Sequence, residues 1–386
     1  MGKSKEIKKN IIISGLDLNA GNRGTAALGY GAFSFLKEKG YLTDDIELIK
    51  FVFYRNLFRK KSERIKEEIL NVQGRVYHRK IVFIRAYEKI LYEKFHVFLP
   101  FSSFKKYLCN IKCVAAINGG DGFSDIYGTK IFHSRLTEIL LAIKAGIPVI
   151  ILPQTIGPFV EKDNRELAHY ILKSASKIYV RDDKYIDVLD KLNLAYERSR
   201  DLSCYMKPEP VNIDIEENAI GINVSGLAYF NRFTGLEGQF DNYPKLLSII
   251  IGKFQKMKVP VYLIPHSYIA NNPLASGDDM LACKEVYEAT TDKTGLYWVD
   301  KDLKSPQVKY VISQMKFFIG TRMHANFAAI YTGVPLYGLG YSYKFEGAFR
   351  ENGVYDNNVS LINNISAEQC EELANRVIEY YKKVVL

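Results

Sequence analysis

Residues 319–326 (IGTRMHAN) place a glycine, an arginine and a histidine where a predicted strand ends and a helix begins. Arg322 carries a fork of hydrogen-bond donors that suits carboxylate and phosphate groups. His324 follows two residues later, and histidine is the side chain that ordinarily changes charge near neutral pH. A single histidine is more often structural, but a histidine beside an arginine at a strand end favours a functional site. We therefore expect an anion to bind here.

Further cations follow other predicted strands. Arg181 comes directly after one, where an unpaired charge is costly, so it either pairs with Asp182 or Asp183 or binds an anionic ligand. Lys344 follows the last predicted strand, and His266 ends another. Arg181, Lys344 and Arg322, with His324, predict a small substrate with several negative charges.

The first half of the chain offers carboxylates and glycines instead. In residues 118–125 (NGGDGFSD), Gly120 lets the backbone approach a ligand, and Asp121 and Asp125 are suited to orient or deprotonate sugar hydroxyls. Asp125 has an equally good alternative role, because it could cap a helix starting near Ile126. These residues predict an acceptor with many hydroxyl groups.

Two further loops carry amides. Residues 15–24 contain three glycines and Asn22 before a helix of about residues 25–39, which is either an anion-binding loop or a tight turn. Residues 152–159 (LPQTIGPF) form a stiff loop with Gln154 as its polar tip. We assign Asn22, Gly120, Gln154 and His266 to acceptor binding.

Short apolar runs alternate with helical patterns along the chain, which indicates βαβ units and mostly parallel sheets. Strands are predicted at residues 10–14, 113–117, 149–152, 177–180, 219–224, 259–264, 317–319 and 336–339. A Gly-x-Pro sequence between helix and strand occurs twice, at residues 146–148 and 333–335, which suggests two similar halves.

The predicted fold is therefore α/β, with two Rossmann-like domains facing across a cleft in a GT-B-like arrangement. We place the boundary at the prolines of residues 207–210, which gives domains of residues 1–207 and 208–386. A final amphipathic helix is expected at residues 366–386. Ligands of such sheets bind beyond the carboxyl ends of the strands, where the residues above lie.

The charge of the 386-residue chain is concentrated in one segment. The net charge is +10, yet residues 51–108 hold 14 Lys and Arg against 5 Asp and Glu, and the rest is nearly neutral. This segment is rich in aromatics, and we expect a basic helical insertion with helices at residues 62–72 and 79–95. Stacking on its aromatics would suit a nucleic acid, although no nucleic-acid motif is present.

Several classes of protein are not expected. The apolar run at residues 11–13 is too short for a signal peptide, and no stretch approaches the ~18 apolar residues of a membrane span. Cys109 and Cys113 have no second Cys/His pair nearby, so we predict no metal site. We expect a cytoplasmic protein.

In order along the chain, these motifs resemble those of the polysaccharide pyruvyl transferase family. The resemblance runs over residues 10–353 and rests on residues 22–24, 119–121, 153–158, 180–182, 320–325 and 333–335, with Tyr343 and Lys344 beyond. Two positions depart from the family pattern: Thr25 stands where many members have Asp, and Asp121 where many have Gly.

The resemblance implies transfer of a pyruvyl group from phosphoenolpyruvate to a sugar, forming a cyclic ketal with no cofactor. On this basis Arg181, Arg322 and Lys344 would bind the donor. His324 would be the general acid, and Asp125 or Asp121 the base. The acceptor would be a sugar of a bacterial surface polysaccharide or of its lipid-linked precursor.

Two other functions are open, namely a GT-B glycosyltransferase using a nucleotide sugar and a non-catalytic nucleic-acid-binding protein. We prefer the transferase and expect no nucleic acid partner. The basic segment then suggests peripheral contact with the anionic inner face of the cytoplasmic membrane, where lipid-linked sugars are presented. Its alternative role is a solvated insertion whose aromatics pack on the first domain's core.

Overall fold

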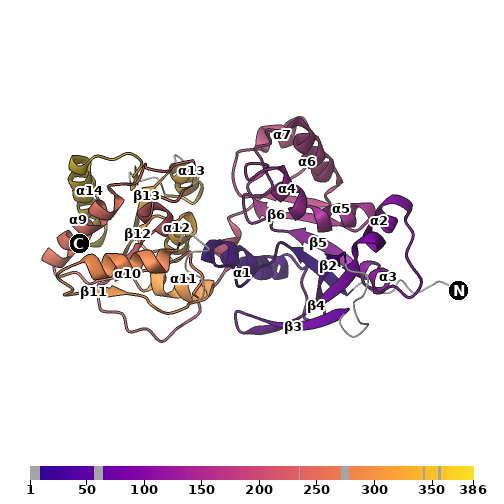
Figure 1. Cartoon of the computed structure of the whole chain (residues 1–386), viewed down its shortest axis with the longest axis horizontal. Coiled ribbons are helices and arrows are strands. Elements are labelled where there is room, and N and C mark those ends of the chain that lie inside the picture. The colour runs from indigo at the N-terminus through magenta and orange to yellow at the C-terminus, as the bar shows by residue number, and fades with distance from the viewer. Residues whose placement is uncertain (1–8, 56–63, 234, 271–277, 342–343, 355–357) are drawn as a thin grey trace. The chain divides into compact units, whose positions relative to one another are not determined.

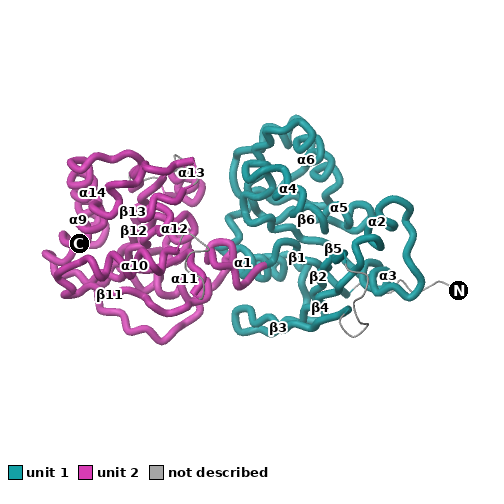
Figure 2. Tube along the Cα trace, viewed as in Figure 1, with its two compact units in different colours: residues 1–16, 28–205 teal, residues 17–27, 206–386 magenta. Residues whose placement is uncertain are grey.

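The computed structural model describes residues 9–55, 64–233, 235–270, 278–341, 344–354 and 358–386. They form two compact units, coloured separately in Figure 2. Unit 1 comprises Met1–Leu16 and Leu28–Tyr205, and unit 2 comprises Asp17–Ala27 and Met206–Leu386. Each unit has its own largely parallel sheet, which confirms the predicted α/β class with two parallel-sheet domains.

The sheet of unit 1 has eight strands in the order β3-β4-β2-β1-β5-β6-β7-β8. Among the described residues every neighbouring pair is parallel except β3 with β4. The chain builds outward from β1 on one side and from β5 on the other, so the topological switch point lies between these two strands. The strands are β1 (Asn10–Ser14), β2 (Glu47–Tyr54), β3 (Ile65–Val72), β4 (Arg75–Arg85), β5 (Ile111–Ala116), β6 (Val149–Gln154), β7 (Lys177–Val180) and β8 (Glu197–Arg198).

The sheet of unit 2 has six parallel strands in the order β11-β10-β9-β12-β13-β14. This is the doubly wound order, with its switch point between β9 and β12. The strands are β9 (Ile220–Asn223), β10 (Val261–Leu263), β11 (Leu296–Trp298), β12 (Phe317–Gly320), β13 (Leu336–Gly340) and β14 (Val359–Leu361).

Helices connect the strands in both units (Figure 1). Those numbered before β9 are α1 (Arg23–Glu38), α2 (Ala86–Phe95), α3 (Ser103–Leu108), α4 (Thr129–Arg135), α5 (Thr137–Lys144), α6 (Lys162–Ser174), α7 (Ile186–Lys191) and the 3-10 helix η2 (Leu202–Tyr205). Those after β9 are α8 (Gly226–Tyr229), α9 (Tyr243–Lys256), α10 (Asp279–Ala289), α11 (Ser305–Ser313), α12 (Met323–Ile330), α13 (Lys344–Glu351) and α14 (Ala367–Val385).

Alternating side chains of the unit 2 strands bury both faces of the sheet. In β12, Phe317 and Ile319 join the apolar cluster that includes residues of α9 and α14, whereas Phe318 joins the cluster that includes residues of α11 and α12. A strand buried on both faces has no polar alternation, which explains its continuous apolar sequence. The predicted strands at residues 10–14 and 177–180 coincide with β1 and β7 for the same reason.

The C-terminal helix is also confirmed. Ser366 caps α14 by accepting a hydrogen bond from the Gln369 amide, and the Gln369 side chain accepts one from the Ser366 amide, which completes a capping box. The buried face of α14 packs on the unit 2 core. No described helix combines the length and apolar character needed to cross a bilayer.

The helical prediction for the basic segment is wrong over most of its length. Residues 65–72 form β3, and residues 79–85 belong to β4, so that only residues 86–95 of the two predicted helices are helical, as α2. β4 pairs with β2 on one side and with β3 on the other, so its polar side chains lie on a sheet surface. Residues 56–63 lie outside the described residues.

One segment departs from the predicted division of the chain. Residues 17–27, expected in the first domain, belong to unit 2 (Figure 2). Farther along, the chain leaves unit 1 and enters unit 2 between Tyr205 and Met206, close to the prolines at which the domain boundary was predicted. Helix α1 therefore has its first turn in unit 2 and its remainder in unit 1.

Candidate functional site

Arg322 is held by a buried carboxylate at the switch point of unit 2. Its Nη2 lies 2.5 Å from Asp279 Oδ1, and its Nε lies 3.1 and 3.3 Å from the two Asp279 oxygens. The Arg322 amide donates to Asn223 Oδ1 at the end of β9. Burial lowers the pKa of Arg322, but the Asp279 carboxylate raises it by more, so the guanidinium stays charged.

Asp279 is fully buried and accepts hydrogen bonds from several elements. Besides Arg322, the donors are the backbone amides of Gly226 at 2.9 Å, Ser267 at 2.9 Å and His266 at 3.1 Å. One carboxylate thus joins the segments after β9, β10 and β12. Asp279 was not predicted as a site residue, because it does not directly follow a predicted strand. In addition, an aspartate at the start of a helix is usually a helix cap, and the adjacent Asp278 has that role.

His324 packs on the first turn of α1. A Cβ atom added to Gly24 would lie 2.7 Å from both Cγ and Nδ1 of the imidazole. The predicted acceptor residues Asn22 and His266 belong to the same unit. Asn22 forms a bridge with Ser267, and its exposed side chain accepts a hydrogen bond from the Gly24 amide. The structure thus brings Asn22, His266, Arg322 and His324 together in unit 2.

Arg23 fixes this loop and was not recognised from the sequence. Its Nε donates to the Leu303 carbonyl at 2.7 Å, its Nη2 lies 2.8 Å from Asp302, and the guanidinium stacks 4.1 Å from the centre of the Tyr268 ring. Its backbone amide donates to the His266 carbonyl. The only signal in the sequence was a charge within a glycine-rich loop.

His266 is buried among positive groups. Burial lowers the pKa of His266 well below its ordinary value of 6.5, and His324, Arg322 and Arg23 lower it further. Its imidazole is therefore neutral at physiological pH, and the surrounding charges favour an anion. A neutral buried histidine suits a positioning role more than a direct proton transfer.

Arg181 lies in unit 1 and pairs mainly with Asp201. Its Nη1 is 2.5 Å from Asp201 Oδ2, and its Nε donates to Thr155 Oγ1 at 3.1 Å. Asp182 is 3.8 Å away, whereas Asp183 pairs with Arg198. A Cβ on Gly120 would lie 3.0 Å from Arg181 Nη1, so this glycine leaves the guanidinium uncovered by a side chain.

Two predicted residues of unit 1 have structural partners. Asp125 accepts hydrogen bonds from the Val160 and Glu161 amides and from Asn164, just before α6. Burial raises the pKa of Asp125, but these hydrogen bonds lower it by more, which makes it a weaker base. Its carboxylate fixes the segment that leads into α6. It does not cap the nearest helix after Ile126, which is α4 and begins at Thr129 with Gly128 as its N-cap.

Gln154 is not a polar loop tip. It ends β6, is fully buried, and its amide nitrogen donates to the carbonyls of Ala116 and Leu152. Asp121, in contrast, is half-buried and accepts a hydrogen bond from the Tyr127 hydroxyl at 2.6 Å. Lys344 begins α13, but its side chain lies outside the described part of the structure.

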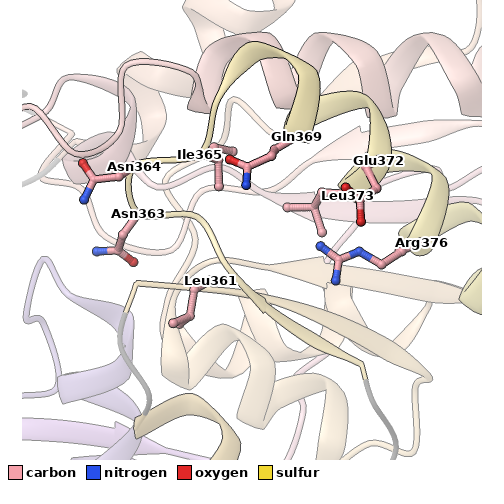
Figure 3. A pocket seen from close by; sticks show the side chains of 8 residues that line it. All are labelled: Leu361, Asn363, Asn364, Ile365, Gln369, Glu372, Leu373 and Arg376. Atoms are coloured by element: carbon pink, nitrogen blue, oxygen red, sulfur yellow. The ribbon is translucent and has the colours of Figure 1, made fainter.

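Other candidate sites are less suitable. No group of His, Cys, Asp or Glu side chains in the described residues is arranged to hold a metal ion. A pocket of about 280 Å³ lies between the segment after β14 and α14, lined by residues such as Asn363 and Arg376 (Figure 3). It contains none of the predicted residues.

Comparison with known proteins identifies the family. The family model "Polysaccharide pyruvyl transferase" matches residues 22–343. The amylovoran biosynthesis protein AmsJ of Erwinia amylovora is 19% identical over 253 residues, which cover 61% of this chain and 58% of that protein. The chain thus spans less than two thirds of that relative's length.

Solved structures share the fold at low identity. A UDP-GlcNAc 2-epimerase from Neisseria meningitidis aligns with a TM-score of 0.51 and 12% identity over 97% of this chain and 92% of its own. A UDP-N-acetylglucosamine 2-epimerase described as putative, from Listeria monocytogenes, aligns with a TM-score of 0.52 and 9% identity over 98% and 91%. These similarities support the GT-B-like fold alone. Because the family model covers most of the sequence, the chain belongs to the polysaccharide pyruvyl transferase family.

Proposed function

We propose that this protein transfers the pyruvyl group of phosphoenolpyruvate to a sugar in the synthesis of a bacterial surface polysaccharide, forming a cyclic ketal. The observation that carries the proposal is the position of Arg322, fixed by buried Asp279 in the same unit as His324. A carboxylate and a phosphate on one small donor suit such a positively charged site.

The reaction needs an acid, a base and a leaving group. His324 protonates the methylene carbon of the donor while a sugar hydroxyl attacks the neighbouring carbon and gives its proton to a base. Phosphate then leaves, and a second hydroxyl closes the ketal and gives its proton back to the His324 imidazole. Asp121 is the better candidate for the base, because the carboxylate of Asp125 already accepts three different donors.

Arg181 in unit 1 and Lys344 in unit 2 are further candidates for donor binding. Arg181 is charged and anchored by Asp201, so it offers a fixed cation after β7. Lys344 follows β13 and adds a second cation in the proposal. Asn22, Gly120, Gln154 and His266 were assigned to the acceptor. Of these, Gln154 has its amide nitrogen engaged by backbone carbonyls, so Asn22 and Gly120 are the stronger candidates.

The test is incubation of the purified chain with phosphoenolpyruvate and candidate acceptors, free or lipid-linked. We expect acceptor-dependent phosphate release together with a mass gain of one pyruvyl group. A glycosyltransferase would instead be stabilised against heat by a nucleotide sugar and not by phosphoenolpyruvate. That result, without phosphate release, would contradict the proposal.

We further propose that the segment joining α2 to α3 contacts an anionic membrane surface (Figure 1). Many aromatics of the basic segment, such as Phe51 and Phe104, are buried in the unit 1 core. Phe95 and Phe101 are 66% and 103% exposed, and Phe101 has a positive φ of 58° that is costly for an aromatic residue. Exposed Lys94, Lys105 and Lys106 flank them. Exposed phenylalanines flanked by lysines are better suited to contact with an anionic membrane leaflet than to stacking on nucleic acid bases.

Phe101→Ser is expected to weaken co-sedimentation with phosphatidylserine-containing vesicles at low salt by about tenfold, because burying a Phe side chain contributes about 1.5–3 kcal/mol. The matched control is Ile69→Ser on β3, also exposed within the basic segment. Equal binding of wild type to neutral and anionic vesicles, or equal loss in both variants, would refute this contact.

A further inference from the structure

The glycine turn after β5 lies at the switch point of unit 1. Asn118, Gly119 and Gly120 have successive φ values of 48°, 68° and 86°. The turn is fixed by hydrogen bonds from the Gly120 amide to the Ile117 carbonyl and from the Gly122 amide to the Asn118 carbonyl. Ligands of open α/β sheets bind beyond the strands at this position.

Arg135, at the end of α4, lies against this turn. A Cβ added to Gly122 would be 1.6 Å from Arg135 Nη1 and 2.2 Å from the Asn118 carbonyl oxygen. One added to Gly119 would be 3.9 Å from Arg135 Nη2. The guanidinium also lies 5.6 Å from the centre of the Tyr127 ring, whose hydroxyl donates to Asp121. Gly122 is therefore required for the guanidinium to lie on the backbone.

Two buried donors at this turn have no acceptor within the described residues. They are Arg135 Nη1 and Asn118 Nδ2, and the Asn118 residue is only 2% exposed. Arg135 also forms no ion pair with a described residue, unlike Arg181 with Asp201. A buried donor without an acceptor costs free energy, so such groups normally mark a site where a ligand or water supplies the oxygen.

The charges select the kind of ligand. Arg135 supplies a cation with a planar fork, which suits a phosphate. Asp121 supplies a carboxylate on the same turn, which would repel a second anionic group but accepts hydrogen bonds from hydroxyls. Arg181 Nη1 also lies close to this turn, at Gly120, but it is paired with Asp201. Arg135 is therefore the cation at the turn that forms no ion pair with a described residue. One such cation together with one carboxylate fits a sugar joined to a phosphate better than it fits the small, highly charged phosphoenolpyruvate.

We propose that Arg135 and Asn118, on the glycine turn of unit 1, bind a phosphate group attached to the acceptor sugar, with Asp121 facing its hydroxyls. The proposal rests on the transferase function above and names its acceptor as a phosphate-linked sugar. Such a phosphate occurs in nucleotide sugars and in polyprenyl diphosphate sugars.

The experiment is calorimetric titration of the full chain with inorganic pyrophosphate. Arg135→Gln is expected to weaken binding by about tenfold or more, because a hydrogen bond to a charged group is lost. Lys130→Gln removes the same charge from an exposed position of the same helix and should bind as wild type does. Gly122→Ala keeps the charge but overlaps both the guanidinium and the Asn118 carbonyl oxygen, so it should also weaken binding. Melting temperatures establish that the variants are folded.

Parallel titrations with uridine diphosphate and farnesyl diphosphate distinguish the two sources. If uridine diphosphate binding is weakened in Arg135→Gln, the acceptor is nucleotide-linked. If farnesyl diphosphate binding is weakened instead, the acceptor is lipid-linked. Pyrophosphate binding that is equal in Arg135→Gln and Lys130→Gln would overturn the inference. Stabilisation by phosphoenolpyruvate, measured separately, should not change in Arg135→Gln, so failure of this site is distinguishable from failure of the proposed function.

Discussion

Replacing Asp279 with asparagine is expected to lower the free energy of unfolding by about 3–5 kcal/mol, because it leaves the buried Arg322 charge without its partner. The amide also has a single acceptor oxygen, whereas the carboxylate accepts hydrogen bonds from Gly226, His266, Ser267 and Arg322 through two. Urea unfolding followed by tryptophan fluorescence suits the measurement, since the one tryptophan, Trp298, lies in unit 2.

Asp278→Asn is the matched control for this variant. Asp278 is adjacent, almost fully buried, and accepts a hydrogen bond from the Leu281 amide as the N-cap of α10. Asparagine caps helices about as well as aspartate, so we expect a loss below ~1 kcal/mol. Equal decreases in the free energy of unfolding in the two variants would show that the ion pair of Asp279 with Arg322 does not stabilise the fold.

His324→Asn is expected to reduce the turnover of pyruvyl transfer by about 100- to 10,000-fold, the usual contribution of a general acid. Binding of phosphoenolpyruvate, measured by thermal stabilisation, should change far less. A variant that loses binding and turnover in equal measure would indicate that His324 holds the donor and does not supply the proton.

Gly24→Ala tests the same imidazole without removing it. The φ of Gly24 is not positive and the residue is in the first turn of α1, so alanine is compatible with the backbone. Its Cβ would overlap the His324 ring and displace it. We expect reduced turnover in this variant and unchanged turnover in His169→Gln, a histidine of unit 1 bonded to Tyr185. Full activity of Gly24→Ala would argue against a fixed imidazole.

The parallel strands were predictable because burial on both faces leaves a continuous apolar run. Ile11–Ile13 in β1 and Phe317–Ile319 in β12 are such runs. The hairpin of β3 and β4 was not predictable in this way. Its residues Ile65–Val72 (IKEEILNV) place apolar side chains at spacings that suit a helix as well as a strand. The strand conformation is stabilised by the pairing of β4 with β2 and of β3 with β4. The residues of β2 are distant in sequence from β4, so the local pattern does not reveal this pairing.

The sequence revealed which residues lie at the candidate site, but not which side chains form ion pairs with them. Arg181 and Arg322 follow strands, which the local pattern reveals. Their counterions Asp201 and Asp279 lie 20 and 43 residues away, and only the fold brings them into contact. The same holds for Arg135, which lies outside the glycine motif, at the end of α4, and contacts the glycine turn only in the folded chain.

The membership of residues 17–27 in unit 2 means that this unit cannot be obtained by cutting the chain once. A fragment beginning at Met206 would lack Arg23, and with it the hydrogen bond to the Leu303 carbonyl and the packing on Tyr268. Ser305, which donates to the Arg23 carbonyl, would also lose its acceptor. Fragment complementation, with a peptide of residues 17–27 added in trans, is therefore the route to an isolated unit 2. Exchange of halves between members of the family must likewise carry this short segment together with the second half.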